Sequence, residues 1–403
     1  MISALLVLTL LSCLIWMGLL TLRGGFWRCD QRLDCPVNRP EWTDWPRVCA
    51  IIPARDEAAY IGATVRSLLT QDYAGAFEVV LVDDQSSDAT AALAQQTAAD
   101  LGEGHRLRIL TTPPLPPGWS GKLWAVNTGV QHVLQAPGRP PDYLLLSDAD
   151  IVHPKGNLTA LLSKAITENR LLVSLMVQLR CQSFWEKALI PAFIFFFQKL
   201  YPFPWANSSR HKLAAAAGGC ILLQRQALLQ AGGLERVKDA LIDDCSLAAA
   251  VKQTAATKDS GKTTWGRIWL GLSTQTHSLR AYDTLDTIWT MVARTAFTQL
   301  GYSTVLLLGS VLGMILVYLW PPLAIAVGAL TQHPWIALCG GLAWLLMAIA
   351  YLPTVRLYRL PPLWAMTLPA TALLYTLMTL DSARRHWQGR GGAWKGRVYP
   401  AKS

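Results

Sequence analysis

The sequence predicts an α/β fold: a domain with a mostly parallel central sheet, attached to a membrane by apolar helices near both ends of the chain. Short apolar runs end abruptly in carboxylates and small polar residues, as in EVVLVDDQSSDA from Glu78 to Ala89. Buried parallel strands have this pattern at their C-terminal ends. Helical segments separate the runs, and strand, helix and strand in series form a βαβ unit. In addition, residues 2–22 and 295–355 contain no Asp, Glu, Lys or Arg.

The composition supports a membrane protein. Of the 403 residues, 52% are hydrophobic and only 15% are charged, which is too apolar for an ordinary soluble enzyme. Much of the net charge of +10 flanks apolar segments, which fits an anionic membrane surface better than a nucleic acid. The eight cysteines form no CxxC pair and no metal-ligand spacing, so we expect buried or free thiols in a reducing compartment: Cys13, Cys29, Cys35, Cys49, Cys181, Cys220, Cys245 and Cys339.

The N-terminal apolar segment, residues 2–22, is long enough to cross a bilayer. A cleaved signal peptide is the alternative, but no positive residue precedes the apolar core, which is also longer than that of a typical signal peptide. Five arginines follow it closely, and by the positive-inside rule they place everything from Arg23 onward in the cytoplasm: Arg23, Arg28, Arg32, Arg39 and Arg47.

A first strand is expected over residues 48–52, where Pro53 would end it, and Asp56 or Glu57 would open the following helix. A second strand over residues 79–82 completes the βαβ unit. Neither strand–helix turn carries GxGxxG or GxxxxGK[ST], the phosphate-binding motifs of dinucleotide dehydrogenases and P-loop enzymes. The sequence therefore argues against both classes.

Asp83 and Asp84 stand at the end of this second strand, where ligands bind in open α/β sheets. Two adjacent acids are costly there unless they bind something, so both are candidate site residues. The alternative is that Asp83 or Ser86 only caps the helix expected to start near Asp88.

Lys122 lies at the start of another expected helix, after a helix over residues 89–101, a strand over residues 107–110 and a proline-rich loop. A lysine near a helix N-terminus would suit an anionic diphosphate. A solvated lysine is the alternative.

Asp148 and Asp150 follow a strand expected over residues 143–146. In an extended chain, residues i and i+2 point to the same side, so both carboxylates could bind one divalent cation. Oxygen ligands select Mg²⁺ or Mn²⁺, which usually completes its coordination with substrate phosphates.

A third acidic element, Asp243 and Asp244, opens the helix that contains Leu247 and Val251. An inverting sugar transfer needs a carboxylate that takes the proton of the acceptor hydroxyl. The alternative is that one aspartate caps the helix and the other interacts with its dipole.

Residues 180–205 are rich in aromatic residues and contain Lys187 and Lys199. The run is too short and too interrupted by proline to span comfortably, so we expect it to lie at the membrane interface. A buried core helix is the alternative. Residues 214–219 (AAAAGG) precede a strand over residues 220–223, where small side chains would permit close approach of a ligand or serve packing.

Two C-terminal spans are expected over residues 303–320 and 335–352. If residues 361–380 also crossed, the basic tail would lie outside, against the positive-inside rule. We therefore expect that segment to be re-entrant or interfacial. The predicted organisation is an N-terminal anchor (1–23), a cytoplasmic domain (24–300, with the interface segment at about 185–205), a C-terminal membrane region (301–382) and a basic cytoplasmic tail (383–403).

The motifs IIPARDE, VLVDDQSSDAT, LLLSDAD and LIDDCSLA, in this order and spacing, resemble those of membrane-bound family 2 glycosyltransferases with the nucleotide-diphospho-sugar transferase (GT-A) fold. The pattern covers about residues 48–298. The stretches RTAFTQLGYS and WKGRVYP are similar to the hopanoid-associated branch, which is akin to ceramide glucosyltransferases. The resemblance implies a GT-A domain, a nucleotide-sugar donor, Mg²⁺ or Mn²⁺ as cofactor, and a membrane lipid acceptor.

The resemblance also implies roles for residues by position. Asp244 would be the catalytic base, with Asp243 beside it, and Asp148 and Asp150 would bind the metal–diphosphate. Asp83 and Asp84 would hold the uracil and ribose of the donor. The remaining nucleotide-sugar contacts would come from Pro53, Arg55, Glu57, Lys122 and Arg294.

The chain departs from the family pattern at two points. Relatives close the site with a Gln/Arg-x-x-Arg-Trp motif, whereas Met291-Val-Ala-Arg-Thr295 keeps only Arg294. Arg294 could still neutralise the leaving diphosphate, but the missing Trp disfavours a processive synthase. The acidic element reads Asp-Asp rather than Glu-Asp, which leaves the base open between Asp243 and Asp244.

The function predicted from the sequence is inverting transfer of a hexose from UDP-glucose or UDP-N-acetylglucosamine to a membrane lipid such as a hopanoid. The enzyme would be a multi-pass protein of the inner membrane with its catalytic domain in the cytoplasm, and no nucleic acid partner is expected. One alternative is a processive polysaccharide synthase. Another is a catalytically silent membrane scaffold, which the three intact acidic elements argue against.

Overall fold

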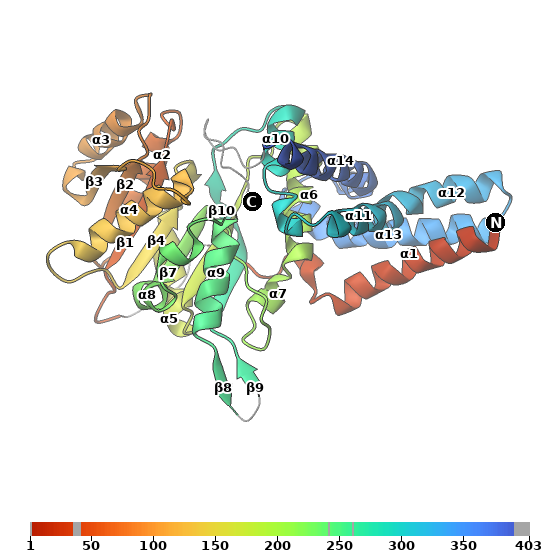
Figure 1. Cartoon of the computed structure of the whole chain (residues 1–403), viewed down its shortest axis with the longest axis horizontal. Helices are drawn as coiled ribbons and strands as arrows, with labels where there is room; N and C mark the ends of the chain where they lie inside the picture. The colour runs from red at the N-terminus through yellow and green to blue at the C-terminus, as the bar shows by residue number, and fades with distance from the viewer. Residues whose placement is uncertain (1, 35–41, 241, 260–261, 391–403) are drawn as a thin grey trace.

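A computed structural model of the chain describes residues 2–34, 42–240, 242–259 and 262–390. Cys35, Arg39, the WKGRVYP stretch and most of the basic tail lie outside these residues. The chain forms a sheet domain and a helical arm, with the N-terminus at the far end of the arm (Figure 1).

The sheet domain is built on eight strands in the order β3-β2-β1-β4-β7-β6-β10-β5. β1 pairs in parallel with β2 and β4, β2 with β3, and β6 with β10, whereas β7 is antiparallel to β4 and β6, and β5 to β10. The strand bounds are β1 Val48–Ala54, β2 Phe77–Asp83, β3 Leu107–Thr111, β4 Tyr143–Ser147, β5 Ile151–Val152, β6 Leu172–Gln178, β7 Cys220–Gln224 and β10 Ile268–Ser278. A separate hairpin joins β8 Thr257–Asp259 to β9 Lys262–Thr264.

Helices cover both faces of the sheet, which explains why its central strands are apolar without alternation. In β1, Ala50 and Ile52 belong to the core under one set of helices, and Cys49 and Ile51 belong to the core under the other. The first set is α2 Ile61–Leu69, α3 Thr90–Asp100 and α5 Asn157–Thr167; the second is α4 Gly121–Gln135, α8 Arg225–Gln230 and α9 Asp243–Thr254.

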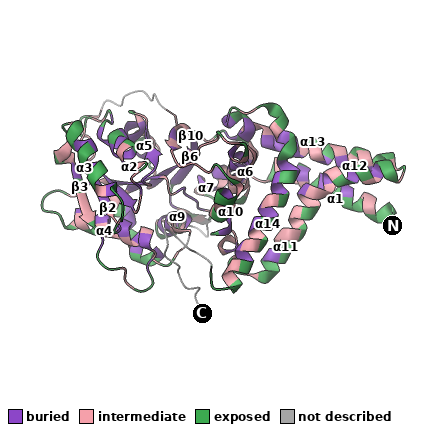
Figure 2. Ribbon diagram, turned by 90° about the horizontal axis from the view of Figure 1, so that it is seen from above, coloured by how far each residue is buried: buried purple, intermediate pink, exposed green. Residues whose placement is uncertain are grey.

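Among the described residues, four helical segments are long and apolar enough to cross a membrane, and they form the helical arm: Ile2–Leu22, Thr304–Leu330, Pro334–Leu357 and Pro362–Trp387. α1, α12 and α13 run side by side away from the sheet domain, while α11 and α14 run at a steep angle to them (Figures 1 and 2). Their bounds are α1 Ile2–Leu22, α11 Thr304–Met314, a π-helical turn Ile315–Leu319, α12 Trp320–Leu330, α13 Pro334–Leu357 and α14 Leu368–Trp387.

Leucine and valine side chains face outward along these helices, with Val305 78%, Leu312 67% and Leu330 84% exposed. Such an apolar exterior fits a lipid environment. Indole groups join the helices inside the arm: Trp16 Nε1 donates to the carbonyl of Val317 at 2.8 Å and Trp320 Nε1 donates to Thr9 Oγ1 at 3.0 Å.

Two helices lie between the sheet domain and the arm: α6 Phe184–Leu200 and α10 Leu285–Ala293 (Figure 1). α7 Phe203–Ala206 and short 3₁₀ turns connect the larger elements: Phe26–Arg28, Gly104–Arg106, Leu234–Val237, Thr298–Leu300 and Pro362–Thr367.

Two local expectations around β1 differ from the structure. β1 continues through Pro53, which pairs with Val82, to Ala54. The next helix begins at Ile61 rather than at Asp56 or Glu57, because Asp56 has a left-handed backbone (φ 51°) that no α-helix contains.

The aromatic segment is a continuous helix through Pro191, and Leu189, Ile190 and Phe195 on it are fully buried. α6 packs against the helices of the arm along its buried side, and its placement at the membrane interface stays a prediction. The last apolar helix, α14, runs to Trp387, and its re-entrant or interfacial placement stays a prediction. The seven cysteines that the structure describes are free thiols, as predicted.

Candidate active site

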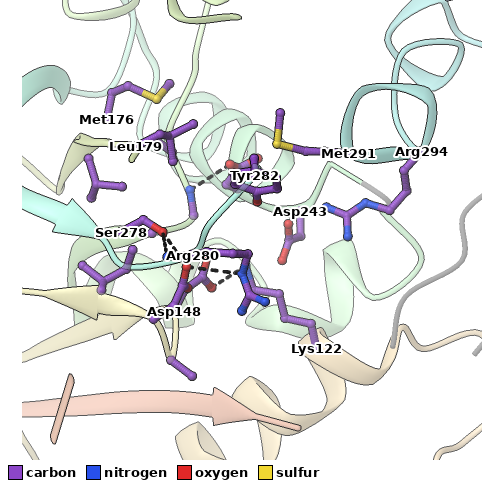
Figure 3. Close-up of a pocket in the computed structure, with 18 of the residues that line it drawn as sticks. Lys122, Asp148, Met176, Leu179, Asp243, Ser278, Arg280, Tyr282, Met291 and Arg294 are labelled. Atoms are coloured by element: carbon purple, nitrogen blue, oxygen red, sulfur yellow. Dashed lines mark hydrogen bonds and ion pairs between the residues drawn. The ribbon is translucent and has the colours of Figure 1, made fainter. Parts of the chain in front are cut away.

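A cavity of about 550 Å³ opens where β1, β4 and β10 end, and α6, α9 and α10 close its other sides. Most of the predicted site residues line it, from segments far apart in sequence (Figure 3). These are Pro53, Glu57, Lys122, Asp148, Asp150, Asp243, Asp244 and Arg294. Arg55, Asp83 and Asp84 are not among the residues that line it.

Asp148 and Asp150 lie in a turn between β4 and β5, not in the extended chain that the sequence analysis assumed. They nevertheless line the same cavity, because the turn is held from behind through its backbone. The carbonyl of Asp148 accepts a bond from Ser147 Oγ at 3.2 Å, that of Ala149 from Thr64 Oγ1 at 2.8 Å, and that of Asp150 from the Leu279 N–H at 2.9 Å.

A buried polar chain extends this support. His153 Nε2 lies 2.9 Å from Ser147 Oγ, His153 Nδ1 lies 2.9 Å from the Asn157 side-chain amide, and Thr276 Oγ1 donates to Asn157 Oδ1 at 3.1 Å. Burial lowers the pKa of His153 to about 3, so its ring is neutral. A neutral ring donates at one nitrogen and accepts at the other, which suits both neighbours.

Lys122 forms an ion pair with Asp148, with Nζ 2.7 Å from Oδ1. Burial alone lowers the pKa of Lys122, but the carboxylates of Asp148, Asp243 and Asp244 raise it above its ordinary value. The ammonium therefore stays charged, and the solvated-lysine alternative is wrong.

Asp150 is buried and contacts two groups on the end of β10. Ser278 Oγ donates to Asp150 Oδ2 at 2.5 Å, and Arg280 Nε lies 3.4 Å from the same oxygen. Arg280 Nη2 also donates to both carboxylate oxygens of Glu57, at 2.6 and 2.8 Å. Burial and the charge of Asp148 raise the pKa of Asp150.

Asp243 and Asp244 form the first turn of α9, as predicted. Asp244 is oriented by two backbone groups: the Gly218 N–H donates to Oδ2 at 2.8 Å and the Cys245 N–H donates to Oδ1 at 2.7 Å. Burial and the charge of Asp243 raise the pKa of Asp244 to about 6. A Cβ on Gly218 would lie 3.1 Å from Lys122 Nζ, so a larger residue would have to displace the end of that side chain by a few tenths of an ångström.

Arg55 and Asp84 have a local partnership outside the cavity. Arg55 Nη1 donates to the Asp84 carbonyl at 2.7 Å, and Thr112 Oγ1 donates to Asp84 Oδ1 at 2.9 Å. Asp83 accepts from the Ser86 N–H at 3.2 Å and from its hydroxyl. The capping alternative is wrong for this pair, because Asp88 accepts from the N–H of Thr90 at the start of α3.

The side of the cavity that faces the helical arm is apolar. Phe193 and Phe197 project from α6, Met291 from α10, and Met176 and Leu179 from the end of β6. Arg294, at the C-terminal end of α10, points into the cavity above Asp243 (Figure 3). The cavity thus has a charged side on the sheet domain and an apolar side on α6 and α10.

The sequence analysis missed Arg280, Ser278 and Tyr282, all of which line the cavity. A signal for them was present: the apolar run over residues 268–272 leads into the polar stretch STQTHSLRAYD, much as the other strands end in polar residues. The end of this strand carries a cation, Arg280, where the other strand ends carry carboxylates.

A divalent cation would find oxygen ligands at the turn. Among the described residues, no group of three or more His, Cys, Asp or Glu side chains could hold a metal ion. Two carboxylates suffice for Mg²⁺ or Mn²⁺ when phosphates and water supply the other ligands. In this structure Lys122 and Arg280 provide the positive charge beside Asp148 and Asp150. A divalent cation would bring positive charge to the same two carboxylates, so these residues fit such an ion.

Comparison with known proteins identifies the class of the sheet domain. Residues 49–231 match the model of Glycosyl transferase family 2. The chain carries a glycosyl transferase family 2 domain. It is a glycosyltransferase with a GT-A fold, as the sequence predicted. No curated protein sequence matches the chain significantly.

One solved structure has the fold of this glycosyltransferase, and two others are less similar. The mannosyltransferase PcManGT from Pyrobaculum calidifontis, solved with GDP-Man and Mn²⁺, is 17% identical with a TM-score of 0.54, and the match covers 94% of this chain and 98% of that one. Staphylococcus aureus TarS (17% identity, TM-score 0.39) is matched over 62% of this chain and 40% of that one. Glucosyl-3-phosphoglycerate synthase from Mycobacterium tuberculosis (17% identity, TM-score 0.38) is matched over 67% and 87%.

Proposed function

We propose that this glycosyltransferase moves one hexose, with inversion, from a nucleotide-diphosphate donor to the hydroxyl of a membrane lipid. The donor is UDP-glucose or UDP-N-acetylglucosamine, and the acceptor is a hopanoid or another polycyclic lipid. The observation that carries the proposal is the two-sided cavity. Its charged side suits a sugar diphosphate, and its apolar side is built by α6 and α10, which pack against the candidate membrane spans.

Asp244 is the proposed general base. Two backbone N–H groups orient its carboxylate, and its raised pKa brings its basicity near neutral pH. The acceptor oxygen attacks the anomeric carbon while its proton passes to Asp244, and the nucleoside diphosphate leaves from the opposite face. Asp243 stays beside it as the second carboxylate of the pair.

The leaving diphosphate needs positive charge. Lys122 and Arg294 both line the cavity, on opposite sides of Asp243, and we assign them to the diphosphate oxygens. Asp148 and Asp150 would hold Mg²⁺ or Mn²⁺. When bound, the ion supplies charge stabilisation for the departing diphosphate.

Pro53 and Glu57 line the cavity on the β1 side, where we place the nucleoside. Arg55, Asp83 and Asp84 would support this wall, and a direct contact of Asp83 or Asp84 with the base or ribose would require their present hydrogen bonds to change. The sheet domain, residues 24–300, would lie on the cytoplasmic side of the inner membrane, and residues 1–23 and 301–382 would anchor it.

The test is transfer of label from UDP-glucose and UDP-N-acetylglucosamine into a hopanoid-containing lipid extract by the detergent-purified protein, with Mn²⁺ or with EDTA. We expect a labelled lipid carrying one sugar, and its loss with EDTA. Label in long glycans would indicate a processive synthase instead. Normal folding without label in any product and without donor binding would leave only the scaffold alternative.

A further inference from the structure

Arg280 connects three segments that meet only in the folded chain. It follows β10, and its guanidinium contacts Glu57 after β1 and Asp150 in the turn after β4. Glu57 is only 6% exposed and Asp150 only 7%. The guanidinium also lies over the ring of Tyr60, 5.3 Å from its centroid. Arg280 is thus a fixed charge in the wall of the cavity and not a mobile surface side chain.

The two contacts of Arg280 are unequal. Its Nη2 group donates to both oxygens of Glu57 at 2.6 and 2.8 Å, whereas its Nε group lies 3.4 Å from Asp150 Oδ2. Asp150 has a shorter bond, 2.5 Å, to the Ser278 hydroxyl. Glu57 therefore anchors the guanidinium, and the contact to Asp150 is the weaker one, which can break while the anchor remains.

The charges explain why the contact must break when a cation binds. Asp148 is already paired with Lys122 at 2.7 Å, so Asp150 is the carboxylate whose cation partner is held more loosely. A divalent ion on Asp150 would place two positive charges a few ångströms from the guanidinium, in a partly buried site where such repulsion is strong. Cation and guanidinium compete for the same carboxylate.

We propose that Arg280 is a positioning residue that neutralises Asp150 while the cavity is empty, and that a divalent cation displaces it from Asp150 but not from Glu57. The inference rests on the proposed function through the assignment of Asp150 as a metal ligand. After displacement, the anchored guanidinium stays in the wall of the cavity, where the diphosphate is expected. Because Arg280 competes with the divalent cation for Asp150, the cation binds tightly only when it enters together with the nucleotide-sugar donor.

The experiment measures Mn²⁺ binding to the detergent-purified full chain without donor, by the electron paramagnetic resonance signal of free Mn²⁺. In Arg280→Gln we expect the Kd for Mn²⁺ to fall about tenfold, because the competing charge is gone. Arg139→Gln makes the same change at an exposed arginine that pairs with Asp142, and should leave Kd unchanged. An unchanged or weaker affinity in Arg280→Gln, including no binding by either protein, would overturn the proposal.

Two further variants cover a failure of Arg280→Gln to fold. Arg280→Lys keeps the charge and should bind Mn²⁺ within about twofold of the unsubstituted protein. Glu57→Gln removes the anchor and leaves the guanidinium to Asp150 alone, so its Kd should rise; a fall would contradict the proposal. Sugar transfer is assayed separately. If the Kd values for Mn²⁺ shift as expected but no sugar is transferred to lipid, the proposed acceptor is wrong and the role of Arg280 stands. If sugar is transferred but the Kd values do not shift, only the role of Arg280 is wrong.

Discussion

The cavity contains two pairs of carboxylates that differ in their partners. Asp148 and Asp150 are each in contact with a cation, Lys122 at 2.7 Å and Arg280 at 3.4 Å. In the part of the chain that the structure describes, no lysine or arginine forms an ion pair with Asp243 or Asp244. Asp244 instead accepts hydrogen bonds from two backbone N–H groups.

This difference separates two chemical tasks. A carboxylate that faces a fixed cation is suited to exchange that cation for a metal ion. A carboxylate without a paired cation is free to accept a proton, and burial together with the neighbouring Asp243 raises the pKa of Asp244 to about 6. In the sequence, both pairs are adjacent or nearly adjacent aspartates. Only the groups around each pair in the folded chain distinguish them.

The largest effect is expected from the second pair. Asp244→Asn removes the proposed base and should lower kcat by about 10³-fold, within the range that general bases contribute. The measurement is label transfer from the UDP-sugar to lipid, with Asp100→Asn at an exposed position of α3 as the matched control. Full activity in Asp244→Asn would move the base to Asp243.

The first pair should behave differently. Asp150→Asn removes one proposed metal ligand and should lower activity by about 10²-fold, equivalent to a few kcal/mol of charge stabilisation. The comparison predicts that raising Mn²⁺ restores part of this loss but none of the loss in Asp244→Asn. Equal responses of both variants to Mn²⁺ would mean that the two pairs share one task.

The pH profile sharpens the same distinction. Because the pKa of Asp244 is raised to about 6, its base form is present above that pH and is lost below it. We expect kcat/KM to be level above pH 7 and to fall about tenfold per unit below pH 6, since one proton inactivates the base. A profile that stays flat down to pH 5 would contradict the assignment of Asp244.

The smallest loss of activity is expected from a substitution at Gly218, which lies between Lys122 of the first pair and Asp244 of the second. Gly218→Ala places a Cβ 3.1 Å from Lys122 Nζ and 3.5 Å from Asp244 Oδ2. A shift of a few tenths of an ångström should cost about tenfold in kcat, because catalytic groups depend on near-ideal placement. Gly104→Ala, with nothing within 4 Å of its Cβ, is the control and should retain full activity. Equal activity of both variants would show that the pairs tolerate displacement.

Much of the fold could be predicted because local patterns report burial. The apolar runs at Val79 and Tyr143 became strands, the uncharged segments became long helices, and strand-end acids marked the cavity. Errors came where tertiary contacts override local preference. Pro53 stays in β1 because its neighbours pair around it, and Pro191 stays within α6 because the helix is packed on several sides.

The sequence by itself determined the class of the sheet, the apolar helices and the three acidic elements, because these depend on the period of hydrophobic residues and on charges next to strand ends. Only the tertiary structure decided which acids meet which cations. Arg280 lies 130 residues after Asp150 and 223 after Glu57, and no local pattern links them. Which charged groups form ion pairs depends on their distance in space. The order of strands in the sheet determines that distance, and the spacing of residues in the chain does not.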